Sequence, residues 1–129
     1  RFVADFIGST NLLTCSLADS RDGFRNLGYH GYVLSAPETE CGASVRDVVL
    51  SVRPERILIS ASPVPEMNQI PCTIVTKVYL GASARLILQD RDGQNLIADI
   101  SSFSPAAAFG EGDAVVASWK KEDGLIIAE

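Results

Sequence analysis

Hydrophobic and polar residues alternate over short segments along most of the chain, which is the pattern of half-buried β-strands. Val, Ile and Thr are abundant in these segments, and Gly, Pro and Asp separate them. The sequence therefore predicts an all-β fold. The expected strands cover residues 12–18, 29–36, 45–53, 56–60, 72–80, 83–90, 95–101, 113–120 and 124–128.

Turn residues divide these segments. Asp-Gly pairs at 22–23, 92–93 and 123–124 predict tight turns, because Gly tolerates a positive φ and Asp bonds to its own backbone. Prolines within 61–71 indicate a connection between two halves of the chain. Residues 102–112 are expected to form a loop with one helical turn.

The first residues have a different pattern. Phe2, Val3, Phe6 and Ile7 form one apolar stripe at helical spacing, and Gly8 is a plausible end of a helix. A helix this short is not stable alone in water. We therefore expect residues 1–10 to be the end of a linker helix that begins in a preceding domain.

Two parts of the chain resemble each other. The segment NLLTCSL at 11–17 aligns with NQIPCTI at 68–74, and SVRPE at 51–55 aligns with SWKKE at 118–122. Chance recurrence of short β patterns is the alternative, but duplication explains the Asn and Cys matches in register. Two units of this size are typical of small, partly open barrels of the OB type, which pack together or exchange strands. We expect a first half over 11–62 and a second over 63–129.

The composition and charge of the chain argue against some classes of protein. The chain has 129 residues, of which 47% are hydrophobic, and a net charge of −5. An acidic balance argues against nucleic acid as the main partner. The apolar runs are too short to span a bilayer. The three cysteines, Cys15, Cys41 and Cys72, form no CxxC pair, which favours reduced thiols and a cytoplasmic location.

Patterns typical of catalysis or cofactor binding do not occur. His30 is the sole histidine, and the sequence has no nucleophile elbow, phosphate-binding loop or metal-ligand spacing. We therefore expect no catalytic residues, no cofactor-binding residues and no metal ligands in this chain.

Two motifs stand out. Arg53-Pro54-Glu55 interrupts a strand with a proline, so the strand ends or bulges there. The two charges either shape a strand corner or face a partner or small ligand. Tyr79-Leu80-Gly81 leaves a strand for a turn, which favours an edge tyrosine and a turn glycine.

Several segments resemble the C-terminal TOBE domain of importer ATPases of the ABC class. They are FVADFIG at 2–8 followed by Asn11-Leu12, VVLSVRPE at 48–55, VYLG at 78–81, and residues 112–119 ending in Trp119. The order and spacing match over nearly the whole chain, most closely to spermidine/putrescine-type and iron(III)-type importers. Residues 18–44 match no part of that pattern.

The resemblance implies tandem OB-like (MOP-like) barrels with a TOBE core over about 45–129. It implies a non-catalytic regulatory and dimerisation domain, with ATP and magnesium bound only by a preceding ATPase domain. The implied partners are a second copy, that ATPase domain and the membrane subunits, at the cytoplasmic face of the membrane without insertion into it. The residues that match motif positions, and so are candidates for interface or regulation, are Asn11, Arg53, Pro54, Glu55, Tyr79, Gly81 and Trp119.

Two other functions stay open. The chain could be a stand-alone module that binds a small oxyanion through Arg53 or backbone amides. It could also bind single-stranded nucleic acid, as other OB barrels do, although its charge disfavours this.

Overall fold

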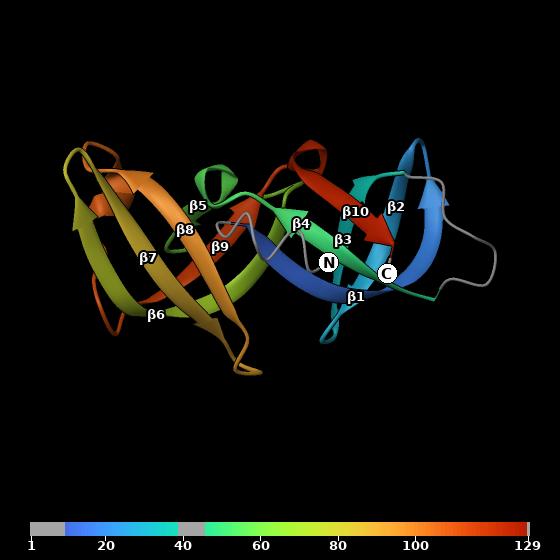
Figure 1. Cartoon of the computed structure of the whole chain (residues 1–129), viewed down its shortest axis with the longest axis horizontal. Coiled ribbons are helices and arrows are strands. Elements are labelled where there is room, and N and C mark those ends of the chain that lie inside the picture. Colours follow the sequence, from blue (N-terminus) through green and yellow to red (C-terminus); the bar gives the residue numbers. More distant parts are fainter. Residues whose placement is uncertain (1–9, 39–45, 129) are drawn as a thin grey trace.

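The computed structural model describes residues 10–38 and 46–128. In that part the chain forms two five-stranded antiparallel sheets, which lie side by side along the long axis of the molecule (Figure 1). The first sheet has the order β10-β4-β1-β2-β3, with β1 (Asn11–Arg21), β2 (Phe24–Tyr29), β3 (Tyr32–Pro37), β4 (Asp47–Val52) and β10 (Gly124–Ala128). The second has the order β5-β9-β6-β7-β8, with β5 (Leu58–Ser60), β6 (Asn68–Leu80), β7 (Ser83–Asp90), β8 (Asn95–Ser101) and β9 (Ala114–Trp119).

Each sheet takes one strand from the other copy of the sequence repeat. β5 follows β4 in sequence but pairs with β9, where Leu58 lies opposite Ser118. β10 follows β9 but pairs with β4, where Leu125 lies opposite Ser51. The second sheet is therefore one contiguous segment, β5 to β9, whereas the first sheet combines β1 to β4 with β10 from the end of the chain. Relative to the sequence repeat, β5 and β10 are exchanged between the two sheets.

The internal repeat is visible in the strand register. Asn11 lies opposite Val52 at the start of the β1–β4 ladder, and Asn68 lies opposite Trp119 at the start of the β6–β9 ladder. β1 and β6 each carry an irregularity in their hairpin ladders, which begins at Leu17 in one and at Ile74 in the other. Leu17 and Ile74 are as far apart in sequence as Asn11 and Asn68, so the bulge recurs at the equivalent position of each unit.

A single apolar core runs through both sheets. β7 shows why the sequence folds this way, because Ala84, Leu86 and Leu88 alternate with more exposed residues and all point inward. Fully buried side chains from the other unit, among them Leu13 and Leu34, belong to the same cluster. Burial of apolar surface at about 25 cal/mol per Å² makes this cluster the main source of stability.

The all-β prediction is confirmed, with ten strands where the structure describes the chain. One strand is wrong in its bounds: 29–36 was expected as one strand, but it contains the β2–β3 turn at His30 and Gly31, whose φ angles are +47° and +87°. Apolar residues continue on both sides of this turn, and His-Gly is not a common turn dipeptide. β2 was therefore missed.

Two further expectations need correction. β6 begins at Asn68 and not at 72, although it contains Pro71. At Pro71 the strand pairs with β9 while its β7 ladder begins only at Cys72, so a residue without an N–H fits there. Asp123-Gly124 is not a hairpin turn, because Asp123 ends a short 3-10 helix and Gly124 begins β10.

Three short 3-10 helices lie in connections of the described chain: η1 (Pro54–Arg56), η2 (Pro105–Ala108) and η3 (Lys121–Asp123). η2 is the helical turn expected within 102–112. The helix expected at the start of the chain lies outside the described residues. Over the part that is described, no helix has the length and apolar character needed to cross a membrane.

Candidate functional site

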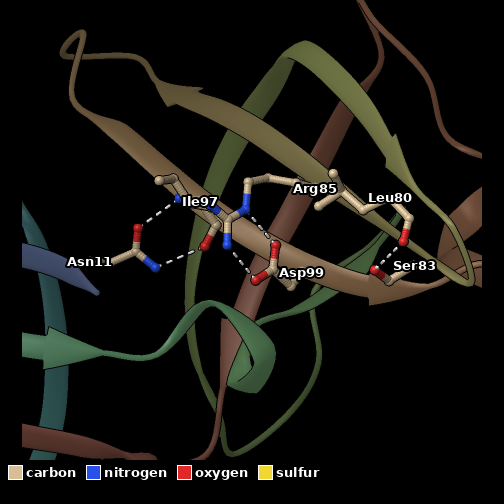
Figure 2. A network of polar contacts seen from close by, with 6 residues as sticks. All are labelled: Asn11, Leu80, Ser83, Arg85, Ile97 and Asp99. Carbon is tan, nitrogen blue, oxygen red and sulfur yellow. Dashed lines mark hydrogen bonds and ion pairs between the residues drawn. The ribbon is translucent and has the colours of Figure 1, made fainter. Parts of the chain in front are cut away.

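Asn11 joins the two sheets. It begins β1 of the first sheet, and its side chain is almost fully buried. Its Nδ2 donates to the carbonyl oxygen of Ile97 in β8 of the second sheet at 2.8 Å, and its Oδ1 accepts from the N–H of Ile97 at 2.6 Å (Figure 2). A further bond to the carbonyl oxygen of Val52 holds the amide in place. Asn11, which matches a motif position in the sequence, thus connects the two sheets. We call this pair of hydrogen bonds to Ile97 the Asn11 clamp.

Asn68 makes the equivalent contact in the opposite direction. It begins β6 of the second sheet and is equally buried. Its Oδ1 accepts from the N–H of Ser35 in β3 at 2.8 Å, and its Nδ2 donates to the carbonyl oxygen of Ser35 at 2.7 Å. The sequence repeat pairs Asn11 with Asn68, but sequence reasoning did not select Asn68 as a site residue.

Tyr29, at the end of β2, and Asp90, at the end of β7, make a further contact between the two sheets. The Tyr29 hydroxyl donates to Oδ2 of Asp90 at 2.8 Å, and both side chains are buried. Burial, together with the neighbouring Asp90 carboxylate, raises the pKa of Tyr29 well above its usual range. The phenol is therefore a neutral donor at neutral pH, which suits a hydrogen bond to a buried carboxylate.

Two buried thiols flank this contact. Burial raises the pKa of Cys15 to about 12, against a backbone hydrogen bond at Leu50 that lowers it. Burial also raises the pKa of Cys72 to about 12, with a smaller contribution from the charge of Asp90. Both are free thiols at equivalent positions of the repeat, and they pack as small apolar residues, as expected from the sequence.

The Arg53-Pro54-Glu55 motif forms a corner at the end of β4. Pro54 is buried at the start of η1, which packs against β8, whereas Arg53 and Glu55 are exposed on either side of it. The equivalent corner, η3, packs against β3 of the first sheet. Pro54 therefore supports the contact between the sheets, and the two charged side chains are free to meet other molecules.

Arg53 and Glu55 face different hollows. Arg53 lines a shallow pocket of about 460 Å³ together with Arg56, Ser51 and residues 122–125. Arg56 lies 4.0 Å from Asp123 in the same pocket. Glu55 lines a separate pocket of about 320 Å³ beside β5 and η2. The corner thus faces a hollow with both positive and negative side chains on one side, and a hollow lined by the carboxylates of Glu55 and Asp99 on the other.

Arg85 and Asp99 reinforce the second sheet next to the Asn11 clamp. The Arg85 guanidinium makes two hydrogen bonds to the Asp99 carboxylate, at 2.8 and 2.9 Å, between the paired strands β7 and β8 (Figure 2). The hydrogen bonds to Asp99 raise the pKa of Arg85. This bidentate ion pair stabilises β8, the strand to which Asn11 is hydrogen-bonded at Ile97.

The remaining motif residues are Tyr79, Gly81 and Trp119. Tyr79 is 70% exposed near the end of β6, and Lys77 lies 5.1 Å from the centre of its ring. Gly81 has a φ of +73° in the β6–β7 turn, which favours glycine. Trp119 is completely buried at the end of β9 and contributes to the core. The structure therefore divides the seven motif residues into a buried group, an exposed group and a turn glycine.

Sequence comparison places the chain beside known proteins. The model of the TOBE domain matches residues 50–127. Over 98% of the chain, 33% of residues are identical to the spermidine/putrescine import ATP-binding protein PotA of Rubrobacter xylanophilus, and 31% to the protein of that name from Thermobifida fusca. The identity is 32% over the whole chain for PotA 1 of Pseudomonas aeruginosa. The chain spans about a third of the length of these relatives, 34% in each case.

Among solved structures, the cytoplasmic molybdate-binding protein ModG in its molybdate-bound form has a similar fold. The TM-score is 0.81, and the match covers 95% of this chain and 98% of that chain at 14% sequence identity. At this identity the likeness shows the fold alone. It confirms the expected tandem OB-like, MOP-like architecture.

Proposed function

Because this chain belongs to the TOBE domain family, we propose that it is the regulatory and dimerisation domain of the ATP-binding subunit of an ABC importer. TOBE domains are non-catalytic parts of ABC ATPases, and the similar proteins are ATP-binding import proteins. The observation that carries the proposal is the alignment of nearly the whole chain with about a third of each of those proteins. On this proposal ATP and magnesium bind in the remaining part of the subunit.

The relatives also suggest a substrate class and a location. Their names specify import of spermidine and putrescine, so we propose that the importer served by this chain takes up a polyamine or a similarly small cation. In that role the domain lies at the cytoplasmic face of the membrane. It acts together with the membrane subunits and with a second copy of itself.

The fold supports a mechanical role. We propose that the domain consists of two copies of one β unit, over about 11–62 and 63–129, with a TOBE core over 45–129. Exchanged strands and the clamps of Asn11 and Asn68 between the two sheets support this. Such a body transmits force without deforming, because its interior is close-packed. Arg53 and Glu55 stand exposed at its corner, and we assign them to contact with a partner chain.

Coupling measurements on the full-length subunit test this role. The complete importer is reconstituted in vesicles, and substrate-stimulated ATP hydrolysis is compared between the wild type, Arg53→Ala and Glu55→Ala. We expect a several-fold loss of stimulation with an unchanged basal rate and unchanged nucleotide affinity. The matched control is Arg21→Ala, which removes an exposed arginine from the end of β1. Full stimulation in both corner variants would contradict the proposal.

Dimerisation is tested separately by light scattering on the full-length subunit and on the isolated chain. We expect the isolated chain to have a mass near twice 13.8 kDa. A monomer in both preparations would remove dimerisation from the proposal and leave the regulatory role in place.

Binding of a small oxyanion is the second candidate function. ModG, whose fold is similar, was solved with molybdate bound, and the pocket beside Arg53 also contains Arg56. Calorimetric titration with molybdate and sulfate tests this function. Saturable heat that is lost in Arg53→Ala would support it, and the absence of heat with either anion would exclude it.

A further inference from the structure

Two hairpin turns meet where the sheets adjoin. The β2–β3 turn belongs to the first sheet and the β7–β8 turn to the second, and both point to the lower edge of the molecule in Figure 1. Three contacts join them: Tyr29 to Asp90, His30 to Asp92, and the guanidinium of Arg91 over the ring of Tyr32. Side chains from the two units are thus interleaved at this junction.

Asp90 is a buried carboxylate at the centre of the junction. It is only 4% exposed, and its Oδ1 accepts from the backbone N–H groups of Asp92 and Gln94, both at 2.9 Å, while Oδ2 accepts from Tyr29. These bonds use three of the roughly four lone-pair positions of a carboxylate. Among residues 10–38 and 46–128, no Lys or Arg lies within ion-pair distance of Asp90. A buried negative charge with no cation beside it is costly, so a bound cation would stabilise it.

His30 adopts a backbone conformation that places its imidazole ring close to Asp90 and Asp92. Its φ of +47° is in the left-handed region, which a residue with a side chain rarely adopts without support. The ring packs edge-on against Tyr29, and Nδ1 lies 3.9 Å from Oδ2 of Asp92. Ligand atoms of His30, Asp90 and Asp92 all lie within 4.8 Å of one another.

We propose that His30, Asp90 and Asp92 bind a divalent first-row transition metal of the zinc type, which links the two units of the chain. One imidazole nitrogen and two carboxylate oxygens suit such an ion better than magnesium or calcium, which prefer oxygen ligands alone. Water would complete a four-coordinate site.

The geometry is close to what such an ion requires. Bonds of about 2.0–2.2 Å in a tetrahedron place ligand atoms roughly 3.4 Å apart, so the three side chains must approach by roughly 1 Å. The side chains of His30 and Asp92 are each 43% exposed and can rotate, whereas Asp90 is fixed by its hydrogen bonds. One ligand comes from the first sheet and two come from the second, so binding would stabilise the junction of the two units.

Zinc titration of the metal-free chain tests the proposal. His30 is the sole histidine, so one set of imidazole signals in the NMR spectrum reports this site directly. We expect the signals to shift with saturation at one zinc ion per chain, calorimetry to give the same stoichiometry, and the thermal unfolding midpoint to rise. Titration with Co²⁺ should give visible absorption bands typical of a low-symmetry site.

Variants assign the site. His30→Ala and Asp92→Asn should abolish saturable binding and the rise in the unfolding midpoint. Asp22→Asn, which changes the Asp-Gly turn of the β1–β2 hairpin, should retain both. Absence of saturable zinc binding to the wild type, or full binding in both His30→Ala and Asp92→Asn, would overturn the proposal. The titration uses the isolated chain without importer subunits, so its result is independent of the proposed transport function.

Discussion

Asn11 and Asn68 make the same two hydrogen bonds in opposite directions between the sheets. Each begins the first strand of its unit, and each bonds to the N–H and the carbonyl oxygen of one residue in the outermost strand of the other unit. Those residues, Ile97 and Ser35, occupy equivalent places in β8 and β3. The chain is thus held together by a clamp that is present twice.

Loss of either clamp should destabilise the whole chain. Asn11→Ala and Asn68→Ala each leave a partly buried N–H and carbonyl group without a partner, which should lower the free energy of unfolding by about 2–4 kcal/mol. Urea unfolding followed by circular dichroism measures this. Asn95→Ala is the matched control, because Asn95 is exposed, and it should change the free energy by less than about 0.5 kcal/mol. Equal effects at all three positions would contradict the assignment.

Loss of the buried Tyr29 hydroxyl should destabilise the chain, because Asp90 then loses a hydrogen-bond donor. Tyr29→Phe leaves the carboxylate without one of its donors, which should lower the free energy of unfolding by about 1–3 kcal/mol. Tyr79→Phe removes an exposed hydroxyl and should have almost no effect. The two variants differ from the wild type by one oxygen each, so equal stability of both would show that the Tyr29 bond is not made.

Trp119 should be among the most costly core residues to truncate. It is completely buried and ends β9 opposite Asn68, so Trp119→Ala creates a large cavity beside a clamp. We expect a loss of about 3–5 kcal/mol in the free energy of unfolding. Trp119 is also the sole tryptophan, so its fluorescence in the wild type should shift to longer wavelength when the chain unfolds. A cost below about 1 kcal/mol would contradict its place in the core.

Because Cys15 and Cys72 are buried, we expect the chain to lose stability at high pH. The pKa of Cys15 and of Cys72 is raised from 9.0 to about 12 by burial, so above pH 9 the unfolded chain releases thiol protons that the folded chain retains. The contribution of the two protonated thiols to the free energy of unfolding is fully present below pH 9, and it is lost as the pH rises from 9 through about 12. Urea unfolding at several pH values measures this loss, and a Cys15→Ala/Cys72→Ala variant should lose less stability over the same interval.

Thiol labelling provides an independent check of that burial. In a Cys41→Ser variant at pH 8, a thiol reagent should label the folded chain very slowly and should label two thiols once the chain is unfolded in urea. Rapid labelling of the folded variant would contradict the position of Cys15 and Cys72 in the core.

Much of this fold could be predicted from local pattern. Alternation of apolar residues placed most strands, and the Asn and Cys matches between 11–17 and 68–74 identified the repeat that the register confirms. The β2–β3 turn was missed because the positive φ of His30 depends on packing against Tyr29 and Asp92. Gly31 was the one local turn signal, and the apolar residues on both sides of the turn favoured a continuous strand instead.

The contacts between the units could not be predicted in the same way. Tyr29 and Asp90 are separated by 61 residues, and Asn11 and Ile97 by 86, so no local spacing relates them. Sequence reasoning selected Asn11 by resemblance and passed over Asn68. A signal was present, since the repeat aligns the two residues, and any role given to one applied equally to the other.

Amide hydrogen exchange at Ile97 and Ser35 tests most directly whether the two units form one body. Both residues lie in edge strands, where an amide that points away from its sheet normally exchanges fast, but here each is bonded to an asparagine side chain. We predict slow exchange with equal protection at both sites, and faster exchange at both when either Asn11→Ala or Asn68→Ala is introduced. Rapid exchange of either amide in the wild type, or a response confined to the mutated clamp, would show that the two units move independently.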